Sequence, residues 1–187
     1  MEEDSLVPKT MKKQRGFSLI ELLIVVAIIL IIAAIAIPNL LRSKIAANES
    51  SAVGSIRTIN TAEVTYSSSW GSGYAAAIGN LGGTAANCAA GGAGATAGAA
   101  CLIDELLSQA PSTKSGYKFT ATGGNLVNGV LNTFEDTATP TVFQTTGVRA
   151  FCSDQGGVIR FNANGNLIAA PCAAVPVAAG QSGPIGN

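Results

Sequence analysis

Residues 17–41 read FSLIELLIVVAIILIIAAIAIPNLL, an apolar run about as long as a membrane is thick. Between Phe17 and Ile37 the only polar side chains are those of Ser18 and Glu21. About 21 helical residues rising about 1.5 Å each give roughly 32 Å, against a hydrocarbon thickness of about 30 Å. The sequence therefore predicts a membrane-spanning helix near the N-terminus.

The composition bounds what the rest of the chain can be. The 187 residues are 48% hydrophobic and 12% charged, which suits one compact domain with this helix attached. Eleven basic residues balance eleven acidic ones, so no positive excess favours nucleic-acid phosphates. Histidine is absent, and no nucleophile with a nearby base is identifiable. We therefore predict no enzymatic activity, no cofactor and no nucleic-acid site.

The flanking charges suggest an orientation for the apolar run. Lys12, Lys13 and Arg15 precede it, and Arg42 follows it, which modestly favours a cytoplasmic N-terminus. A plain anchor is one alternative. Another is a signal peptide cleaved after residues 34–36 (Ala-Ile-Ala), which would release a secreted soluble binding domain. The apolar core is longer than that of a usual signal peptide, which disfavours this second alternative.

The hexapeptide at residues 16–21, GFSLIE, resembles the N-terminus of a type IV prepilin, as does Pro38 near the far end of the run. The resemblance implies cleavage between Gly16 and Phe17 by prepilin peptidase and N-methylation of Phe17. It also implies that Glu21 is the fifth residue of the mature chain and that Pro38 kinks the helix. One departure is Leu30, where family members often have glycine, so we do not assume that the helix melts before Pro38 in a filament.

The predicted leader, residues 1–16, has two possible starts. Read from Met1 it contains Glu2, Glu3 and Asp4, which are unusual in a basic leader. Read from Met11 it is MKKQRG, with three positive charges. Both starts are kept as alternatives.

Glu21 is the first candidate functional residue. A charged side chain at the bilayer centre costs about 2.5 to 3.5 kcal/mol on insertion scales, so such a residue is a functional candidate by default. After cleavage Phe17 would carry an α-ammonium group, and in a bundle this group could pair with Glu21 of a neighbouring subunit and set the axial register. The alternative is an unpaired Glu21 whose carboxylate reaches the headgroup zone.

Beyond the run, the pattern predicts one helix from Phe17 to about Ser69. Its apolar seam has spacings close to 3.5 residues per turn. The residues of this seam are Ile45, Ala52, Ile56, Ile59, Glu63 and Tyr66. The polar residues predicted on the opposite face of the helix are Asn48, Ser51, Ser55 and Thr58.

A Gly/Ala-rich segment and then a strand-rich segment follow the helix. Residues 104–110 predict a short helix that Pro111 ends. Alternation predicts a strand at 116–122 and a second strand at 132–139. A hairpin of 148–153 with 158–162 is predicted next, and Asn164-Gly165 is predicted to turn the chain into residues 167–170. Residues 138–160 also resemble the C-terminal sheet of bacterial type IV pilins and pseudopilins.

Together these features predict an α+β pilin fold, in which a long kinked helix packs on a four-stranded antiparallel sheet. The expected segments are the leader 1–16, the membrane or filament-core half-helix 17–41 and the amphipathic half-helix 42–69, followed by the connecting loop 70–113 and the sheet head with its C-terminal loop, 114–187.

The four cysteines lie in the part predicted to leave the cytoplasm, where disulfides persist. Three pairings are possible, and we predict Cys88 with Cys101 and Cys152 with Cys172, because each closes a short loop across turn-rich sequence. No paired short spacing suits zinc, so no metal site is predicted. The acidic residues Glu135, Asp136 and Asp154 are interpreted as solvated surface rather than as a calcium site.

The functional prediction is a structural subunit that polymerises with its own copies into a type IV pilus after leader cleavage and methylation. Its partners would be prepilin peptidase, the pilus assembly machinery and the inner membrane before assembly, and it would end in an extracellular pilus. A secretion pseudopilin or a minor pilin is the alternative within the same architecture.

Overall fold

The computed structural model describes residues 16–89, 94–165, 172 and 182–184. It begins with a 52-residue helix, α1 (Leu19–Trp70), followed by three short helices and six strands. The short helices are α2 (Ile78–Leu81), α3 (Ala85–Cys88) and α4 (Glu105–Ser108). The strands are β1 (Thr113–Lys114), β2 (Tyr117–Val127), β3 (Val130–Pro140), β4 (Ala150–Asp154), β5 (Arg160–Asn162) and β6 (Ser182–Pro184).

The chain divides into two compact units, Met1–Leu40 and Leu41–Asn187. The described part of the first unit is the N-terminal half of α1 with the residues just before it. The second unit, called the head below, contains the remainder of α1, the short helices and the sheet. The long helix predicted from Phe17 to about Ser69 is confirmed within two residues at each end.

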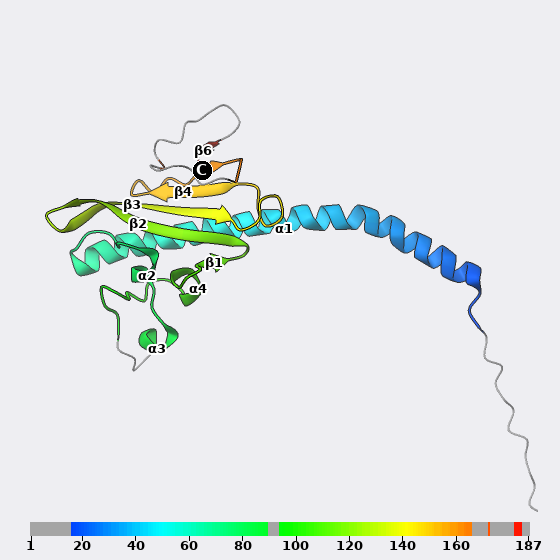
Figure 1. Ribbon diagram of the computed structural model, residues 1–187, viewed down its shortest axis with the longest axis horizontal. Helices are drawn as coiled ribbons and strands as arrows, with labels where there is room; N and C mark the ends of the chain where they lie inside the picture. The colour runs from blue at the N-terminus through cyan, green and yellow to red at the C-terminus, as the bar shows by residue number, and fades with distance from the viewer. Residues whose placement is uncertain (1–15, 90–93, 166–171, 173–181, 185–187) are drawn as a thin grey trace, which may run out of the picture. The chain divides into compact units, whose positions relative to one another are not determined.

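The head has one antiparallel sheet in the order β1-β2-β3-β4-β5-β6 (Figure 1). The predicted α+β class with a helix packed on an antiparallel sheet is confirmed. The predicted number of four strands is wrong, since the sheet of the described residues has six. The prediction missed β1 and β6, which have only two and three residues. Strands this short show no alternation in the sequence.

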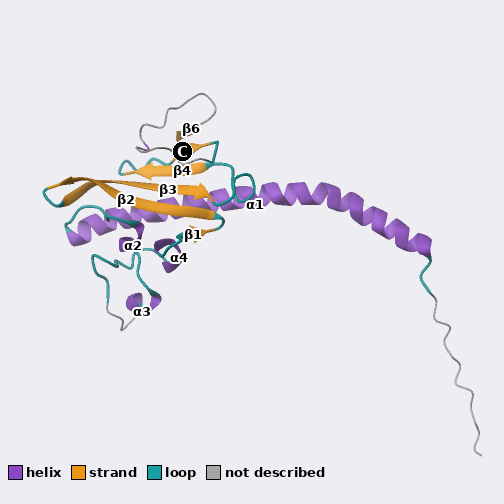
Figure 2. Cartoon of the chain, in the orientation of Figure 1, coloured by secondary structure: helices purple, strands orange, loops and turns teal. Residues whose placement is uncertain are grey.

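The sheet is dominated by the long β2–β3 hairpin, which Figure 2 shows as the two longest arrows. Its turn is Asn128-Gly129, with φ of 52° and 81°. Positive φ at both central residues gives the turn a twist that matches the flanking strands. Phe119 pairs with Ala138 in this register, so the inward side chains of the two strands lie side by side.

The second predicted hairpin is confirmed, with Ala150 of β4 opposite Asn162 of β5. Asp154 ends β4 and holds the turn, since its Oδ1 accepts from Gly156 N at 2.8 Å and its carbonyl from Gly157 N at 2.8 Å. Residues 167–170, into which Asn164-Gly165 was predicted to turn the chain, lie outside the described residues.

The core of the head lies between α1 and the inner face of the sheet. From the seam predicted for the helix, Ala52, Ile56, Ile59 and Tyr66 are buried in this core with Phe119, Ala138 and Phe151. Ser55, predicted on the opposite face, is only 5% exposed, so that prediction is wrong. The buried arc of α1 is wider than one seam, because the core cluster also includes Leu81, Ile103 and Leu107 from the segment between α1 and the sheet.

Candidate functional site

The residues around the predicted processing site precede the regular helix. Gly16, Phe17 and Ser18 are non-helical, and α1 begins at Leu19. The Phe17 side chain is 83% exposed, and a Cβ added at Gly16 would meet no atom within 4 Å. The Gly16–Phe17 bond therefore lies in open, non-helical backbone, which an enzyme can approach. Cleavage and methylation remain predictions.

Glu21 lies in the first turn of α1, and its carboxylate is engaged within its own chain. Its Oε2 accepts a hydrogen bond from the backbone N of Ser18 at 3.0 Å. Ser18 stands at the N-cap and Glu21 at the third helical position, so this bond is half of a capping box. The sequence signal that could have predicted it is Ser-x-x-Glu before an apolar run.

The apolar half of α1 has no cover within the described chain. None of the most hydropathic 18-residue window of the helix is buried. By length and composition this helix can cross a membrane. Leu30 and Pro38 are both helical, and α1 has no break at either. The large exposed side chains here are Leu19, Ile20, Leu22, Leu23, Ile24, Val25, Val26, Ile28, Ile29, Leu30, Ile31, Ile32, Ile35, Ile37 and Leu40.

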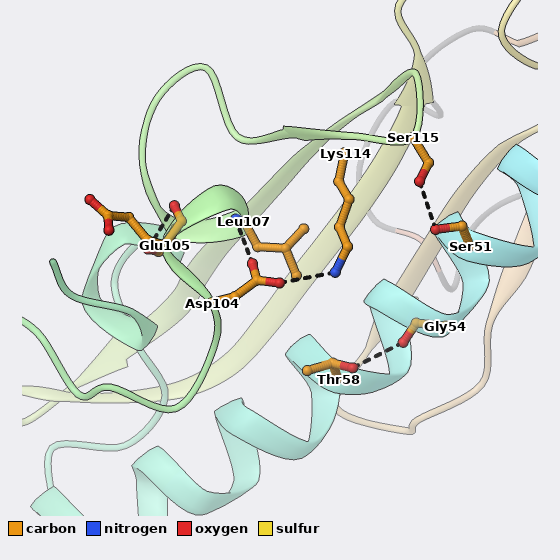
Figure 3. Close-up of polar contacts among 9 residues, drawn as sticks. Ser51, Gly54, Thr58, Asp104, Glu105, Leu107, Lys114 and Ser115 are labelled. Carbon is orange, nitrogen blue, oxygen red and sulfur yellow. Dashed lines mark hydrogen bonds and ion pairs between the residues drawn. The ribbon is translucent and has the colours of Figure 1, made fainter. Parts of the chain in front are cut away.

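Within the head, the short helix α4 is fixed by polar contacts that Figure 3 shows. Asp104 is its N-cap, with Oδ1 accepting from Leu107 N at 2.8 Å, while Oδ2 binds Lys114 Nζ at 3.0 Å. Ser51 of α1 donates to Ser115 Oγ at 3.0 Å. The short helix predicted at residues 104–110 is thereby confirmed, and its cap is tied to β1.

Two disulfides join the cysteine pairs that the sequence predicted. Cys88–Cys101 has a Cα–Cα distance of 5.6 Å and encloses the Gly/Ala-rich segment after α3. Cys152–Cys172 has a Cα–Cα distance of 5.9 Å and attaches residue 172 to β4. Both cysteines of the second pair are fully buried. Covalent links of this kind suit a small domain exported to an oxidising compartment.

The acidic residues of β3 and β4 are arranged differently from the prediction. Asp136 is 0% exposed, so its interpretation as solvated surface is wrong. It points inward because it alternates with the buried Phe134 and Ala138 along β3. Glu135 and Asp154 are opposite each other and line a different face. Among the described residues, no three histidine, cysteine or acidic side chains are grouped to hold a metal.

These features define a class of protein: a membrane-length N-terminal helix, an unburied apolar face, and a disulfide-linked α+β head. The family described as "Prokaryotic N-terminal methylation motif" matches residues 11–37, which include the predicted processing site. The recognition of a type IV pilin N-terminus from Gly16, Phe17 and Glu21 is thereby confirmed.

Two curated relatives extend this likeness. The type IV major pilin protein PilA of Myxococcus xanthus is 46% identical over 54 residues, which are 29% of this chain and 24% of the relative. The type IV wide pilus major component PilA4 of Thermus thermophilus is 59% identical over 39 residues, 21% of this chain and 30% of the relative. The chain thus spans less than a third of the length of the curated relatives it matches. No solved structure matches it significantly.

Proposed function

We propose that this chain is the structural subunit of a type IV pilus, held in the inner membrane as a precursor and polymerised after its leader is removed. The observation that carries the proposal is the uncovered apolar half of α1, none of whose most hydropathic window is buried by the chain. Such a surface needs a membrane or copies of itself. The methylation motif over residues 11–37 and the two pilin relatives support both covers for this surface, the membrane before assembly and other copies of the chain afterwards.

Burial of the apolar half-helix supplies the driving force for assembly. Apolar surface removed from water contributes about 25 cal/mol per Å², and less when it leaves lipid, where packing replaces the hydrophobic effect. The helix would lie in the membrane before assembly and against neighbouring helices afterwards. Little apolar surface would meet water at either stage.

Glu21 would give the bundle its register. Prepilin peptidase would cut before Phe17, and methylation would keep the new amine positively charged. The amine of one subunit would then pair with Glu21 of an axially offset neighbour. A buried pair of this kind specifies one arrangement more than it adds stability.

The alternatives differ in what they predict for mature material. A pseudopilin or minor pilin would also begin at Phe17 but would be scarce in, or absent from, long surface filaments. A secreted soluble binding domain would begin at Ile37 or nearby and would lack the apolar half-helix. Neither is favoured by a specific contact among the described residues of the head.

The test combines processing with microscopy. Intact mass spectrometry of filaments sheared from cells should give an N-terminal methylated Phe17, and electron micrographs should show long, thin filaments made of this chain. Gly16→Val should leave uncut precursor in the membrane, because the Val side chain occupies the space that Gly16 leaves open. Gly98→Ala, in the head, is the matched control and should be processed normally. Mature chains that begin at Ile37, or normal processing of Gly16→Val, would contradict the proposal.

A further inference from the structure

A polar cluster is buried where α1 crosses β3 and β4 in the head. Asn60 and Glu63 come from one face of the helix, Asp136 from β3 and Ser153 from β4. Glu63, Asp136 and Ser153 are each 0% exposed. Carboxyl groups are rarely buried to this degree without a partner, so the cluster requires an explanation.

One hydrogen bond, one strand pairing and one charge interaction connect the four residues into one group. Asn60 Nδ2 donates to Ser153 Oγ at 2.8 Å. Ser153 is directly opposite Asp136 in the antiparallel pair, so their side chains share one face of the sheet. Asp136 in turn interacts electrostatically with Glu63.

The cluster contains more hydrogen-bond acceptors than donors. Glu63 Oε2 accepts from Ala75 N at 2.8 Å. Four other buried oxygen atoms have no partner among the described residues: Asn60 Oδ1, Glu63 Oε1 and both carboxylate oxygens of Asp136. An ionised carboxylate can only accept hydrogen bonds, so two ionised groups would leave these oxygens unpaired in a buried site.

No basic side chain faces the cluster from the described elements packed around it. The other charged groups acting on Asp136 are Glu135 and Asp154, which are acidic. On β5, Arg160 pairs with Cys152 and therefore belongs to the opposite face from Ser153. Arg57 of α1 is exposed. A proton is the remaining source of a donor within the chain itself.

The pKa values of the two carboxyl groups are raised in the direction that keeps such a proton bound. Burial raises the pKa of Glu63 to about 7, against the lowering effect of the hydrogen bond from Ala75. Burial also raises the pKa of Asp136 well above its usual range. Its own backbone opposes that shift, while the charges of Glu63, Asp154 and Glu135 increase it.

We propose that Glu63 and Asp136 form a proton-dependent lock between α1 and the sheet. In the locked state at least one of the two carboxyl groups is neutral and donates a hydrogen bond from its O–H to one of the unpaired oxygens of the cluster. Loss of the proton places two like charges in a buried site and loosens the contact between the helix and β3–β4. The head is thus most stable in mildly acidic surroundings.

The direction in which the stability of the head changes with pH follows from proton linkage. A carboxyl group whose pKa is higher in the folded than in the unfolded chain binds more protons when folded. Its contribution is fully present below the unfolded value of 4.5 and is lost as the pH rises through about 7 for Glu63. Asp136 extends the loss to higher pH, because its pKa is also raised.

Thermal unfolding of the full chain in detergent micelles tests the lock. Between about pH 5.5 and about pH 8.5 the midpoint of the wild-type head should fall by several degrees, of order 5 °C, given about 2–4 °C per kcal/mol for a chain of this size. Glu63→Gln and Asp136→Asn should each reduce this fall, and the double variant should abolish it.

The matched control is Glu105→Gln, which removes an exposed carboxylate of the head at α4. Glu105 Oε2 accepts from Ala85 N at 3.1 Å, and the amide oxygen of glutamine can accept the same bond. This variant should therefore keep the wild-type dependence of the midpoint on pH.

A second measurement covers variants that fail to fold. Infrared spectra of the wild-type chain near neutral pH should contain the carbonyl band of a neutral carboxylic acid, which disappears on alkaline titration. Absence of that band, or a wild-type midpoint as pH-independent as that of the double variant, would overturn the lock. Calcium or sodium raising the wild-type midpoint at alkaline pH, but not that of the double variant, would overturn it in favour of a bound cation.

Discussion

Glu49 and Arg149 join α1 to the start of β4 although they are 100 residues apart in the sequence. Glu49 Oε2 lies 2.7 Å from Arg149 Nη2 and accepts from its Nε at 2.8 Å. Glu49 Oε1 accepts from the backbone N of Val148 and of Arg149, both at 3.0 Å. The guanidinium group also lies 5.4 Å from the ring centre of Phe161. One carboxylate therefore fixes the backbone entering β4 as well as the side chain above it.

We predict that Glu49→Gln lowers the free energy of unfolding by about 2–3 kcal/mol at neutral pH, since it removes charge-assisted hydrogen bonds at a site 5% exposed. Burial alone would raise the pKa of Glu49, but the hydrogen bonds from Val148 and Arg149 outweigh it and lower the pKa. The contribution is therefore present above the unfolded value of 4.5 and lost as the pH falls below it. Chemical denaturation at several pH values checks this.

The control for that experiment is again Glu105→Gln, which makes the same chemical change at an exposed position of the head. It should change stability by less than about 0.5 kcal/mol at every pH, because glutamine keeps the acceptor for Ala85 N. An equal loss in the two variants at neutral pH would mean that the contact with Arg149 contributes nothing specific.

Gly54 is a helix-interior glycine whose replacement should stabilise the head. A Cβ added there meets nothing within 4 Å, and the position is exposed. Gly54→Ala should raise the free energy of unfolding by about 0.5–1 kcal/mol, because alanine reduces the entropy of the unfolded chain. A Cβ added at Gly71 also meets no atom within 4 Å, but φ is 67° there. Gly71→Ala should therefore lower the free energy of unfolding by about 1 kcal/mol. Chemical denaturation of both variants checks this, and equal effects would contradict the argument.

Gly83 lies against the Cys88–Cys101 disulfide. A Cβ at this position would be 2.6 Å from Cys88 Sγ and 3.2 Å from Cys101 Sγ. We predict that Gly83→Ala costs about 1–3 kcal/mol, as overpacking does when the neighbours are fixed. Gly98→Ala, whose nearest atom would be 3.9 Å away, should cost much less. A thermal shift assay of both variants, with and without reductant, distinguishes a disulfide clash from a general effect of alanine.

The two disulfides should contribute separately to stability. Their sequence separations of 13 and 20 give about 3 kcal/mol each by chain entropy, which is large beside the stability of a small domain. Non-reducing peptide mapping of exported material should recover the Cys88–Cys101 and Cys152–Cys172 pairs without free thiols. Peptides joining Cys88 to Cys172 would show that the Gly/Ala-rich segment lies differently against the sheet.

The sequence predicted the long helix well because its signal is both long and periodic. It underestimated the β2–β3 hairpin, since the second strand was expected at 132–139 and begins at Val130. The dipeptide Asn128-Gly129 was a sufficient turn signal in this case. The burial of Asp136 was not predictable from alternation alone. An inward position occupied by a carboxyl group looks like a polar surface residue until the strand it belongs to is placed against α1.

The candidate site illustrates the same difference. Gly16, Phe17 and Glu21 form a local motif, and local motifs are visible in the sequence. The lock of Glu63 with Asp136 joins residues from α1 and β3, and only the register of β3 against β4 and the position of α1 above it bring them together. Long-range polar contacts of this kind produce no periodic pattern in the amino-acid sequence.

Glu21 makes a capping bond inside its own chain, so an assembly defect in Glu21→Ala would have two explanations. Glu21→Gln separates them, because its amide oxygen can still accept from the Ser18 backbone N while the negative charge is gone. If pairing with another subunit's Phe17 amine sets the register, both variants should accumulate as membrane monomers with both head disulfides formed and should give few filaments. Filament yield in sheared fractions, measured beside total membrane-bound chain, checks this. Wild-type yield from Glu21→Gln would show that the helix cap, not the charge, is what assembly needs.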